Sequence, residues 1–440
     1  MSEMRDEIAW PFIPIQSNIS IASARGCYLT TTDGQQLLDA AGGAIVVNVG
    51  HGRKRVADAV ARAIQHCTYI VPPWLTPSRE ALMRRLQSEW LSDGLNRVHL
   101  CSGGSEGNET AMKIALQYHA ARGESQRHKI VGRDLSYHGT TLATTAVGGH
   151  EARKLGLSHA LNSYLKVAAP YPLRCPLGRH HPEAGQFYVK AFESLIEQEG
   201  GDTIAAFLTE PITGSSGGAI VPPEDYLPGI QALCRKHGIL LLLDEVMTGF
   251  GRTGLAFGYQ HWDIQPDVVV SGKGLSGGYA PIVGVFAREH IASSIAGAGM
   301  NVMFHTFGAH PAACAAAESV LQIMSEEKLV ERARVQGGKL NDLLHDLLAN
   351  HPHVAEIRGK GLLQAVEVVA DRDSLEPFEE AAHITHRIVR AAMQRGVFFY
   401  GGGTGSIRDI ICMGPPLIIE DDELDRMANV LKQAIDEVTG

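Results

Sequence analysis

The sequence predicts an α/β fold in which a mainly parallel sheet is wrapped by helices and is followed by a smaller α+β domain. Short apolar runs alternate with stretches of helical periodicity, which is the pattern of a parallel sheet with helical crossovers. From about Pro311 the pattern of apolar and polar residues changes to that of long amphipathic helices and then to a strand-like alternation. Together these two observations indicate a large first domain and a smaller second one.

Several apolar runs are predicted strands, and their continuous apolarity indicates that both faces of the sheet are buried. They are Arg97–Cys101, Lys129–Arg133, Ile204–Thr209, Ile239–Leu243, Asp267–Ser271 and Ile282–Ala287. Between them we expect helices such as Glu106–Ala121 and Tyr226–His237. Gly238 follows the second of these helices, and a glycine in the left-handed conformation often ends a helix.

The C-terminal region begins with two amphipathic helices, expected over residues 311–324 and 327–348. Residues 354–369 then alternate as strands do. We therefore expect residues 50–310 to form the large domain and residues 311–440 the small domain. Residues 1–49 are predicted to be an N-terminal segment that packs with the small domain.

The composition is that of an ordinary globular protein, with 440 residues of which 45% are hydrophobic and 20% charged. A formal net charge of -9 gives no broad attraction to nucleic acid or to an anionic membrane surface. The most apolar run, GILLLLDEV, is too short to span a bilayer, and the N-terminus shows no export signal. Small-molecule chemistry is therefore the expectation, with neither nucleic acid nor a membrane as a partner.

The 7 cysteines are scattered without a CxxC pair, so neither a disulfide framework nor a zinc site is indicated. A reducing, cytoplasmic location fits this pattern. His180 and His181 lie near Cys175 in RCPLGRHHPE. Adjacent histidines on such a loop are more often solvated than metal-bound, and we expect no metal.

A glycine-rich turn stands between a predicted strand and a predicted helix in HLCSGGSEGNETAMKIAL. The free N–H groups of Gly103, Gly104 and Ser105 and the positive helix end would face one spot, which suits a phosphate. Strand–glycine–helix turns are also common structural joints, so the turn alone leaves both interpretations open. It is not a P-loop, because no Gly-Lys-Ser/Thr follows.

A carboxylate and an amine follow two successive predicted strands. Asp244 comes directly after GILLLL, at the sheet edge where the ligand-contacting groups of open α/β folds collect. Taken alone, it would be a helix cap. Lys273 stands between glycines in VVVSGKG, after the next strand. A carboxylate and an amine beside a phosphate-binding turn are the groups that pyridoxal phosphate needs.

Several motifs occur in a fixed order, namely SGGSEGNETAMKIA, SYHGTT, LTEPITG, LLLDEVMTGFGRTG, VVVSGKGLSGGYAPI and FHTFGAHPAACAA. Their order and spacing, from about Gly42 to the C-terminus, resemble those of the class III aminotransferases, the group that contains ornithine, 4-aminobutyrate and ω-amine transaminases. The resemblance implies fold type I with a seven-stranded type of sheet, and pyridoxal 5'-phosphate as the cofactor. It also implies a homodimer whose active sites are built from both subunits, with a tetramer left open.

Carried over residue by residue, the resemblance assigns a catalytic pair. Lys273 would be the Schiff-base lysine, because a glycine-flanked turn lets its amine bind the cofactor, leave it and act as acid and base. Asp244 would partner the pyridine nitrogen and keep it protonated. The other matches would contact the cofactor: Val246 and Tyr137 on its two ring faces, Gly104 and Ser105 at its phosphate, Thr306 at the phosphate across the dimer interface, and Glu210 in an orienting role.

Departures from the family pattern indicate the substrate class. Relatives that handle α-amino acids place an arginine where this chain has Cys412. The resemblance therefore implies that this chain has no fixed arginine there to bind an α-carboxylate with two hydrogen bonds. Arg408 in GTGSIRDI resembles the mobile loop arginine of amine transaminases. Ile45 stands where several ω-amine transaminases carry a tryptophan, which leaves more room for the substrate. Trp74 lines the substrate entrance or stiffens its own proline-rich loop.

We therefore expect an aminotransferase (transaminase) that moves an amino group from a primary amine or ω-amino compound to a keto acid, with pyruvate favoured, by a ping-pong mechanism. The same apparatus serves decarboxylases, aminomutases and phospho-lyases, because the fold does not decide which substrate bond breaks. A non-catalytic protein that binds pyridoxal phosphate is the other alternative, although the matches at Lys273, Asp244 and Thr306 argue against it.

Overall fold

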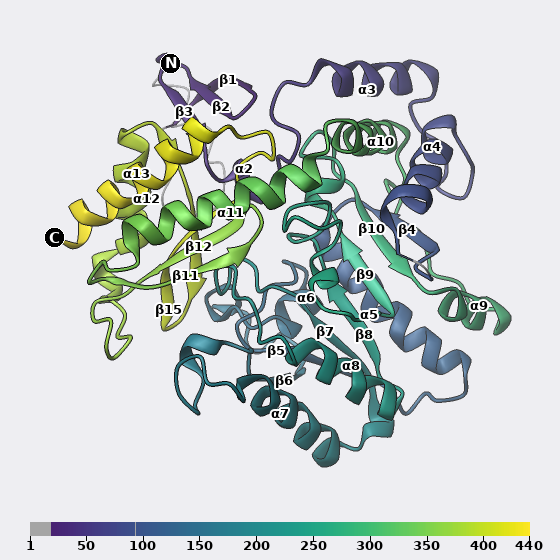
Figure 1. The fold of residues 1–440 in the computed structure, drawn as a ribbon. Helices are drawn as coiled ribbons and strands as arrows, with labels where there is room; N and C mark the ends of the chain where they lie inside the picture. Colours follow the sequence, from purple (N-terminus) through teal and green to yellow (C-terminus); the bar gives the residue numbers. More distant parts are fainter. Residues whose placement is uncertain (1–18, 93) are drawn as a thin grey trace.

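The computed structural model describes residues 19–92 and 94–440, so residues 1–18 of the predicted N-terminal segment lie outside the described part. The described strands form one seven-stranded sheet and two four-stranded sheets. The large sheet occupies the middle of the helix-covered body, and the smaller sheets lie beside α12 (Ile384–Gln394) and α13 (Asp421–Thr439) (Figure 1).

The seven-stranded sheet has the order β4-β10-β9-β8-β7-β5-β6 and is mainly parallel, with β10 antiparallel to both of its neighbours. This confirms the predicted fold class. The pattern did not predict β6, because three residues at a sheet edge are too few to show a period. The strands are β4 (Arg97–Cys101), β5 (Lys129–Arg133), β6 (Leu165–Val167), β7 (Ile204–Thr209), β8 (Leu240–Asp244), β9 (Val268–Ser271) and β10 (Val283–Ala287).

Helices cover both faces of this sheet, as the apolar strands predicted. The helices before α10 are α2 (Gly42–Ile45), α3 (Lys54–His66), α4 (Pro77–Arg85), α5 (Gly104–Ala121), α6 (Leu142–Val147), α7 (Ala184–Glu199), α8 (Tyr226–His237) and α9 (Glu289–Gly297). Along β8, Leu240 and Leu242 pack in the apolar cluster that contains α5. Leu241 and Leu243 pack on the other face, in the cluster that contains α7 and α8. Gly238 ends α8 in the left-handed conformation (φ 66°), which confirms the predicted cap.

The C-terminal region contains the two predicted amphipathic helices, α10 (Pro311–Glu326) and α11 (Leu329–Leu348). The alternating stretch after them forms an antiparallel hairpin of β11 (Val354–Lys360) and β12 (Leu363–Val368). β12 pairs with β15 (Ile407–Met413), and β15 pairs with β14 (Tyr400–Thr404). α10 packs against α3 and α4, at the top of the view in Figure 1.

The third sheet joins the N-terminal strands to one strand of the C-terminal region. It contains β1 (Ile21–Arg25), β2 (Tyr28–Thr31) and β3 (Gln36–Asp39), and β13 (Val397–Phe398) adds to β3 in parallel. The domain boundaries at residues 50 and 311 stay predictions. None of the helices within residues 19–92 and 94–440 is long and apolar enough to cross a membrane.

Candidate active site

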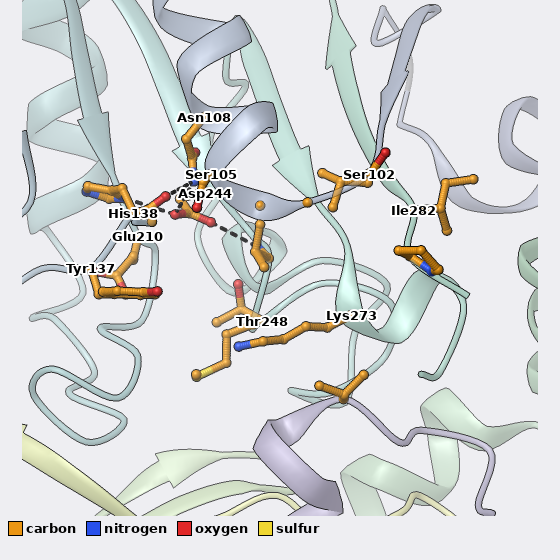
Figure 2. Close-up of a pocket in the computed structure, with 18 of the residues that line it drawn as sticks. Ser102, Ser105, Asn108, Tyr137, His138, Glu210, Asp244, Thr248, Lys273 and Ile282 are labelled. Carbon is orange, nitrogen blue, oxygen red and sulfur yellow. Dashed lines mark hydrogen bonds and ion pairs between the residues drawn. The ribbon is translucent and has the colours of Figure 1, made fainter. Parts of the chain in front are cut away.

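A cavity of about 390 Å³ opens at the carboxyl ends of β7, β8 and β9. Its wall comes from the end of β8 and from the turns that follow β4, β5, β7 and β9, so residues far apart in sequence meet there. Figure 2 shows Lys273 extending into the space that Asp244, Tyr137 and Thr248 border. The sequence-predicted residues that line the cavity are Gly104, Ser105, Tyr137, Glu210, Asp244, Val246 and Lys273.

Lys273 is the first residue of a short 3-10 turn after β9, and its backbone has a positive φ of 40°. The flanking glycines are needed for close packing. A Cβ at Gly272 would lie 2.5 Å from a methyl of Val283, and a Cβ at Gly274 would lie 2.3 Å from the amide nitrogen of Asn48. Loss of hydration lowers the pKa of Lys273 to about 8, although the nearby Asp244 and Glu210 carboxylates oppose this shift.

Asp244 is the last residue of β8, where it pairs with Val270 of β9. It therefore belongs to the strand, one position beyond the predicted strand end. Its side chain is buried and accepts three hydrogen bonds. Asn108 Nδ2 donates to Oδ2 at 2.7 Å, His138 Nδ1 lies 2.9 Å from the same oxygen, and the Val246 N–H donates to Oδ1 at 3.0 Å. This network fixes the carboxylate at the edge of the cavity.

Sequence reasoning missed Asn108 and His138. For Asn108 one signal was available, a polar residue on the buried face of the predicted helix, whereas His138 lies in the turn after β5, where the pattern gives no such signal. Asn108 Oδ1 and His138 Nε2 are buried and have no hydrogen-bond partner within the described residues. These two atoms can therefore form further hydrogen bonds beyond those that Asn108 and His138 make with the Asp244 carboxylate.

The glycine-rich turn begins α5, with Gly103 as the residue before the helix and no side chain capping its first N–H groups. Gly104 lies against Val246, since a Cβ there would be 3.3 Å from both methyls of that valine. Ser105 Oγ accepts a hydrogen bond from the Thr140 N–H at 2.9 Å. The positive end of α5 thus faces the cavity, as expected of a phosphate-binding turn.

Glu210 and Tyr137 line the wall on the side of β7 and β5. Burial raises the pKa of Glu210, which lies 3.7 Å from Arg133 and accepts a hydrogen bond from the Gly214 N–H at 2.8 Å. The guanidinium of Arg153 lies over the ring of Tyr137, 4.8 Å from its centroid. Glu210 thus helps to order the loop after β7.

Four sequence-predicted residues do not line this cavity. Ile45 is buried against Gly414, and its neighbour Val46 lines the cavity instead. Trp74 is 66% exposed. Thr306 is exposed on the segment between α9 and α10, and its predicted role at the phosphate of another subunit stays a prediction.

Arg408 requires a correction, because it lies within strand β15 and not in a loop. The glycine-rich stretch before it forms β14, and Gly402 pairs with Ile410 across this hairpin. Arg408 lines a second cavity, and its guanidinium donates hydrogen bonds to the carbonyls of Phe378 and Gly405. The hairpin was missed because three successive glycines resemble a loop in sequence.

A solved transaminase shares this fold. The thermostable (S)-enantioselective omega-transaminase from Thermomicrobium roseum matches with a TM-score of 0.93 at 34% identity, over 100% of this chain and 99% of that chain. The fold is therefore that of the fold type I transaminases, with the lysine and carboxylate at the carboxyl edge of its sheet.

The sequence comparisons identify the family. The model for aminotransferase class-III matches residues 14–435. The taurine–pyruvate aminotransferase of Rhodobacter capsulatus is 35% identical over 424 residues, covering 93% of this chain and 90% of the relative. The putrescine–pyruvate aminotransferase of Pseudomonas aeruginosa is 31% identical over 418 residues, covering 95% and 90%. The chain belongs to the class III aminotransferase family and is a pyridoxal-phosphate-dependent aminotransferase.

Proposed function

We propose that the protein transfers the amino group of a primary amine or ω-amino compound to pyruvate in two half-reactions of the ping-pong type. One observation carries the proposal. Lys273 and Asp244 border one cavity, while Cys412 is buried in β15, at the position where the family resemblance implies an arginine in enzymes of α-amino acids. Two relatives that are named for pyruvate, from Rhodobacter capsulatus and Pseudomonas aeruginosa, support the choice of acceptor.

The residues at the cavity fit pyridoxal phosphate. No hydrogen bond holds the Lys273 amine within the described part of the chain, so it is available to an aldehyde. The uncapped first turn of α5 offers N–H groups to a phosphate. Asp244 offers a carboxylate to the pyridine nitrogen, and its hydrogen bonds from Asn108 and His138 fix its orientation. This donor set supports the residue roles that the resemblance implied.

When bound, pyridoxal phosphate supplies a ring that accepts the electron pair left at the substrate carbon. Lys273 would hold it covalently and, once released, would remove the proton from the amine-bearing carbon and return it later. Asp244 would keep the pyridine nitrogen protonated. Val246 and Tyr137 would bound the two ring faces, while Glu210 orders the loop beside them.

We also propose a homodimer with shared active sites. Exposed apolar side chains gather in two segments, residues 69–75 and 303–307, and the ring of Tyr69 contacts that of Phe307 at 6.2 Å. Trp74 and Phe307 are 66% and 64% exposed, which is unusual for such large side chains. A second copy that covers this surface would bury them and carry Thr306 toward the neighbouring cavity. Whether dimers then pair into tetramers is left to sedimentation analysis.

A cytoplasmic location remains part of the proposal. It rests on the cysteines at positions 27, 67, 101, 175, 234, 314 and 412, all of which are free thiols in the structure. Free buried thiols are typical of proteins that fold in a reducing compartment.

The proposed function is tested by screening a panel of primary amines and ω-amino compounds against pyruvate and 2-oxoglutarate. We expect alanine to form from pyruvate in step with loss of the amine, without release of carbon dioxide or phosphate. Release of either product would favour a decarboxylase or a phospho-lyase. Binding of the cofactor without any single-turnover reaction would favour the non-catalytic alternative.

A further inference from the structure

A second cavity of about 1100 Å³ adjoins the active-site cavity. Ser215 lines both, and Tyr137, which lines the first, contacts two residues that line the second, His150 and Arg153. The far wall of the second cavity comes from the hairpin of β14 and β15. The ring of Tyr137 therefore stands at the junction of the two spaces.

Arg153 is the notable cation at this junction. Its guanidinium lies 4.8 Å from the centroid of the Tyr137 ring, and it has neither an ion pair nor a hydrogen bond within residues 19–92 and 94–440. The nearest acidic residue in sequence, Glu151, pairs with Lys154 instead at 2.7 Å. A cation held on an aromatic face keeps its N–H donors free for another ligand.

Two neutral polar groups stand beside Arg153. The Nδ1 atom of His150 is buried without a hydrogen-bond partner, and its ring meets the edge of Tyr137 at 6.4 Å. Burial and the nearby Arg153 lower the pKa of His150, so the ring is neutral near pH 7 and one of its nitrogens carries a hydrogen to donate. The hydroxyl of Tyr400 on β14 also has no partner within the described residues and lines the same cavity.

Glu380 and Arg390 also line the second cavity without an ion pair among the described residues, and Asp409 Oδ2 is buried without a hydrogen-bond partner. Other charged groups nearby have partners. Arg408 donates to the carbonyls of Phe378 and Gly405, and Asp409 accepts a hydrogen bond from Thr385. Glu210 is paired with Arg133 on the opposite side of Tyr137. Among the described residues, Arg153 is the cation that lies over the Tyr137 ring at the junction, it has no ion pair there, and the unpaired Nδ1 of His150 is beside it.

We propose that Arg153, His150 and Tyr400 form an anion-binding subsite, which makes the preferred amine donor one that carries an acidic group, carboxylate or sulfonate, at the end away from its amine. This inference rests on the proposed transamination and adds the substrate class. Arg153 would leave the ring of Tyr137 or tilt on it to pair with the acid, while His150 and Tyr400 donate hydrogen bonds to the same group.

The test compares three amines of similar size in single-turnover reactions with the holoenzyme: 3-aminopropanoate, 2-aminoethanesulfonate and the neutral 3-aminopropanamide. For each enzyme, the readout is the ratio of the specificity constants of the acidic and the neutral amine. We expect Arg153→Gln to lower this ratio about tenfold, because the contact is charge-assisted but lies at an exposed rim. His150→Phe should lower it about threefold.

Lys154→Gln is the matched control, because Lys154 is the next cation along the chain and its charge is already paired. Its ratio should equal that of the wild type. Calorimetric binding of propanoate and of propane-1-sulfonate to the holoenzyme gives a second readout, which Arg153→Gln should weaken by a similar factor. A fall in only one of the two acid arms would identify which acid the subsite takes.

An unchanged ratio in Arg153→Gln, or an equal loss with the neutral amide, would overturn the subsite and leave the proposed transamination standing. If the wild-type enzyme took the amino group from none of the three amines and from no amine of the wider panel, both the proposed function and the subsite would be overturned.

Discussion

Two regions differ in how their polar groups are held: the floor of the active-site cavity, which carries Lys273 and Asp244, and its rim, meaning the adjoining second cavity that Arg153 and Arg408 line. On the floor, Asp244 accepts three hydrogen bonds, from Asn108 of α5 and from His138 and Val246 in the turns after β5 and β8. At the rim, Arg153 rests on an aromatic face without any ion pair in the part of the chain described. Preorganised groups suit a cofactor that stays bound, whereas unpaired groups suit substrates that come and go.

The comparison predicts different consequences for substitutions in the two regions. Changes on the floor should reduce turnover with every substrate, because they act on the chemistry itself. Changes at the rim should alter the choice between substrates and leave the binding of the cofactor intact.

The largest effect is expected for Lys273→Ala, which removes the amine from the floor. Turnover should fall roughly a thousandfold or more with all amines, because the proposed acid and base is lost, while the protein still folds and assembles. Borohydride reduction of the wild-type holoenzyme, followed by peptide mapping, should find the cofactor attached to Lys273. A label on Lys360 or another lysine would contradict this assignment.

Asp244→Asn should retain the cofactor and lose turnover by a factor on the order of a hundred, because a neutral amide no longer favours a protonated pyridine. The measurement is kcat with a saturating amine, together with the absorbance of bound cofactor. Asn108→Asp would be the complementary variant, since it places a second carboxylate beside the first. Wild-type turnover in Asp244→Asn would mean that this carboxylate only terminates its strand.

Arg408→Ala tests the prediction, made from the sequence, that Arg408 at the rim binds the carboxylate of the keto-acid acceptor. If Arg408 leaves its carbonyl partners to hold the carboxylate of pyruvate, its loss should cost about 1.5–3 kcal/mol, or roughly ten- to a hundredfold, in the half-reaction with the keto acid. The half-reaction with an uncharged amine provides the internal comparison. Equal effects on both half-reactions, or none on either, would show that the bonds to Phe378 and Gly405 are its whole role.

The smallest effect is a pH dependence on the floor. With a pKa of about 8 in place of 10.5, Lys273 is mostly protonated at pH 7 and mostly neutral above pH 8. The rate at which the cofactor-free protein takes up pyridoxal phosphate should therefore rise about tenfold from pH 7 and level off above pH 8. A rate that climbs steadily to pH 10 would show an ordinary lysine. Lys273→Ala provides the background rate.

Local sequence determined much of the floor. The isolated lysine between glycines and the carboxylate after an apolar strand both follow from short motifs, since the geometry of a strand followed by a tight turn is set within a few residues. The strands of the seven-stranded sheet were predicted within one residue, except β6, because long apolar runs are strong signals, whereas β14 and β15 of a smaller sheet were not predicted. The substrate residues were harder: Ile45 and Trp74 do not line the cavity, and Arg408 lies on a strand.

The alternation of strands and helices, and the motifs that carry the lysine, the carboxylate and the phosphate-binding turn, can be recognised from the amino-acid sequence alone. Which polar groups contact one another depends on the folded arrangement. Asn108 reaches Asp244 across 136 positions of sequence, and Tyr400 on β14 lines the same cavity as Arg153. Such contacts depend on how separate sheets and loops pack against one another, and a side chain that is unpaired after packing looks the same in sequence as one that is paired.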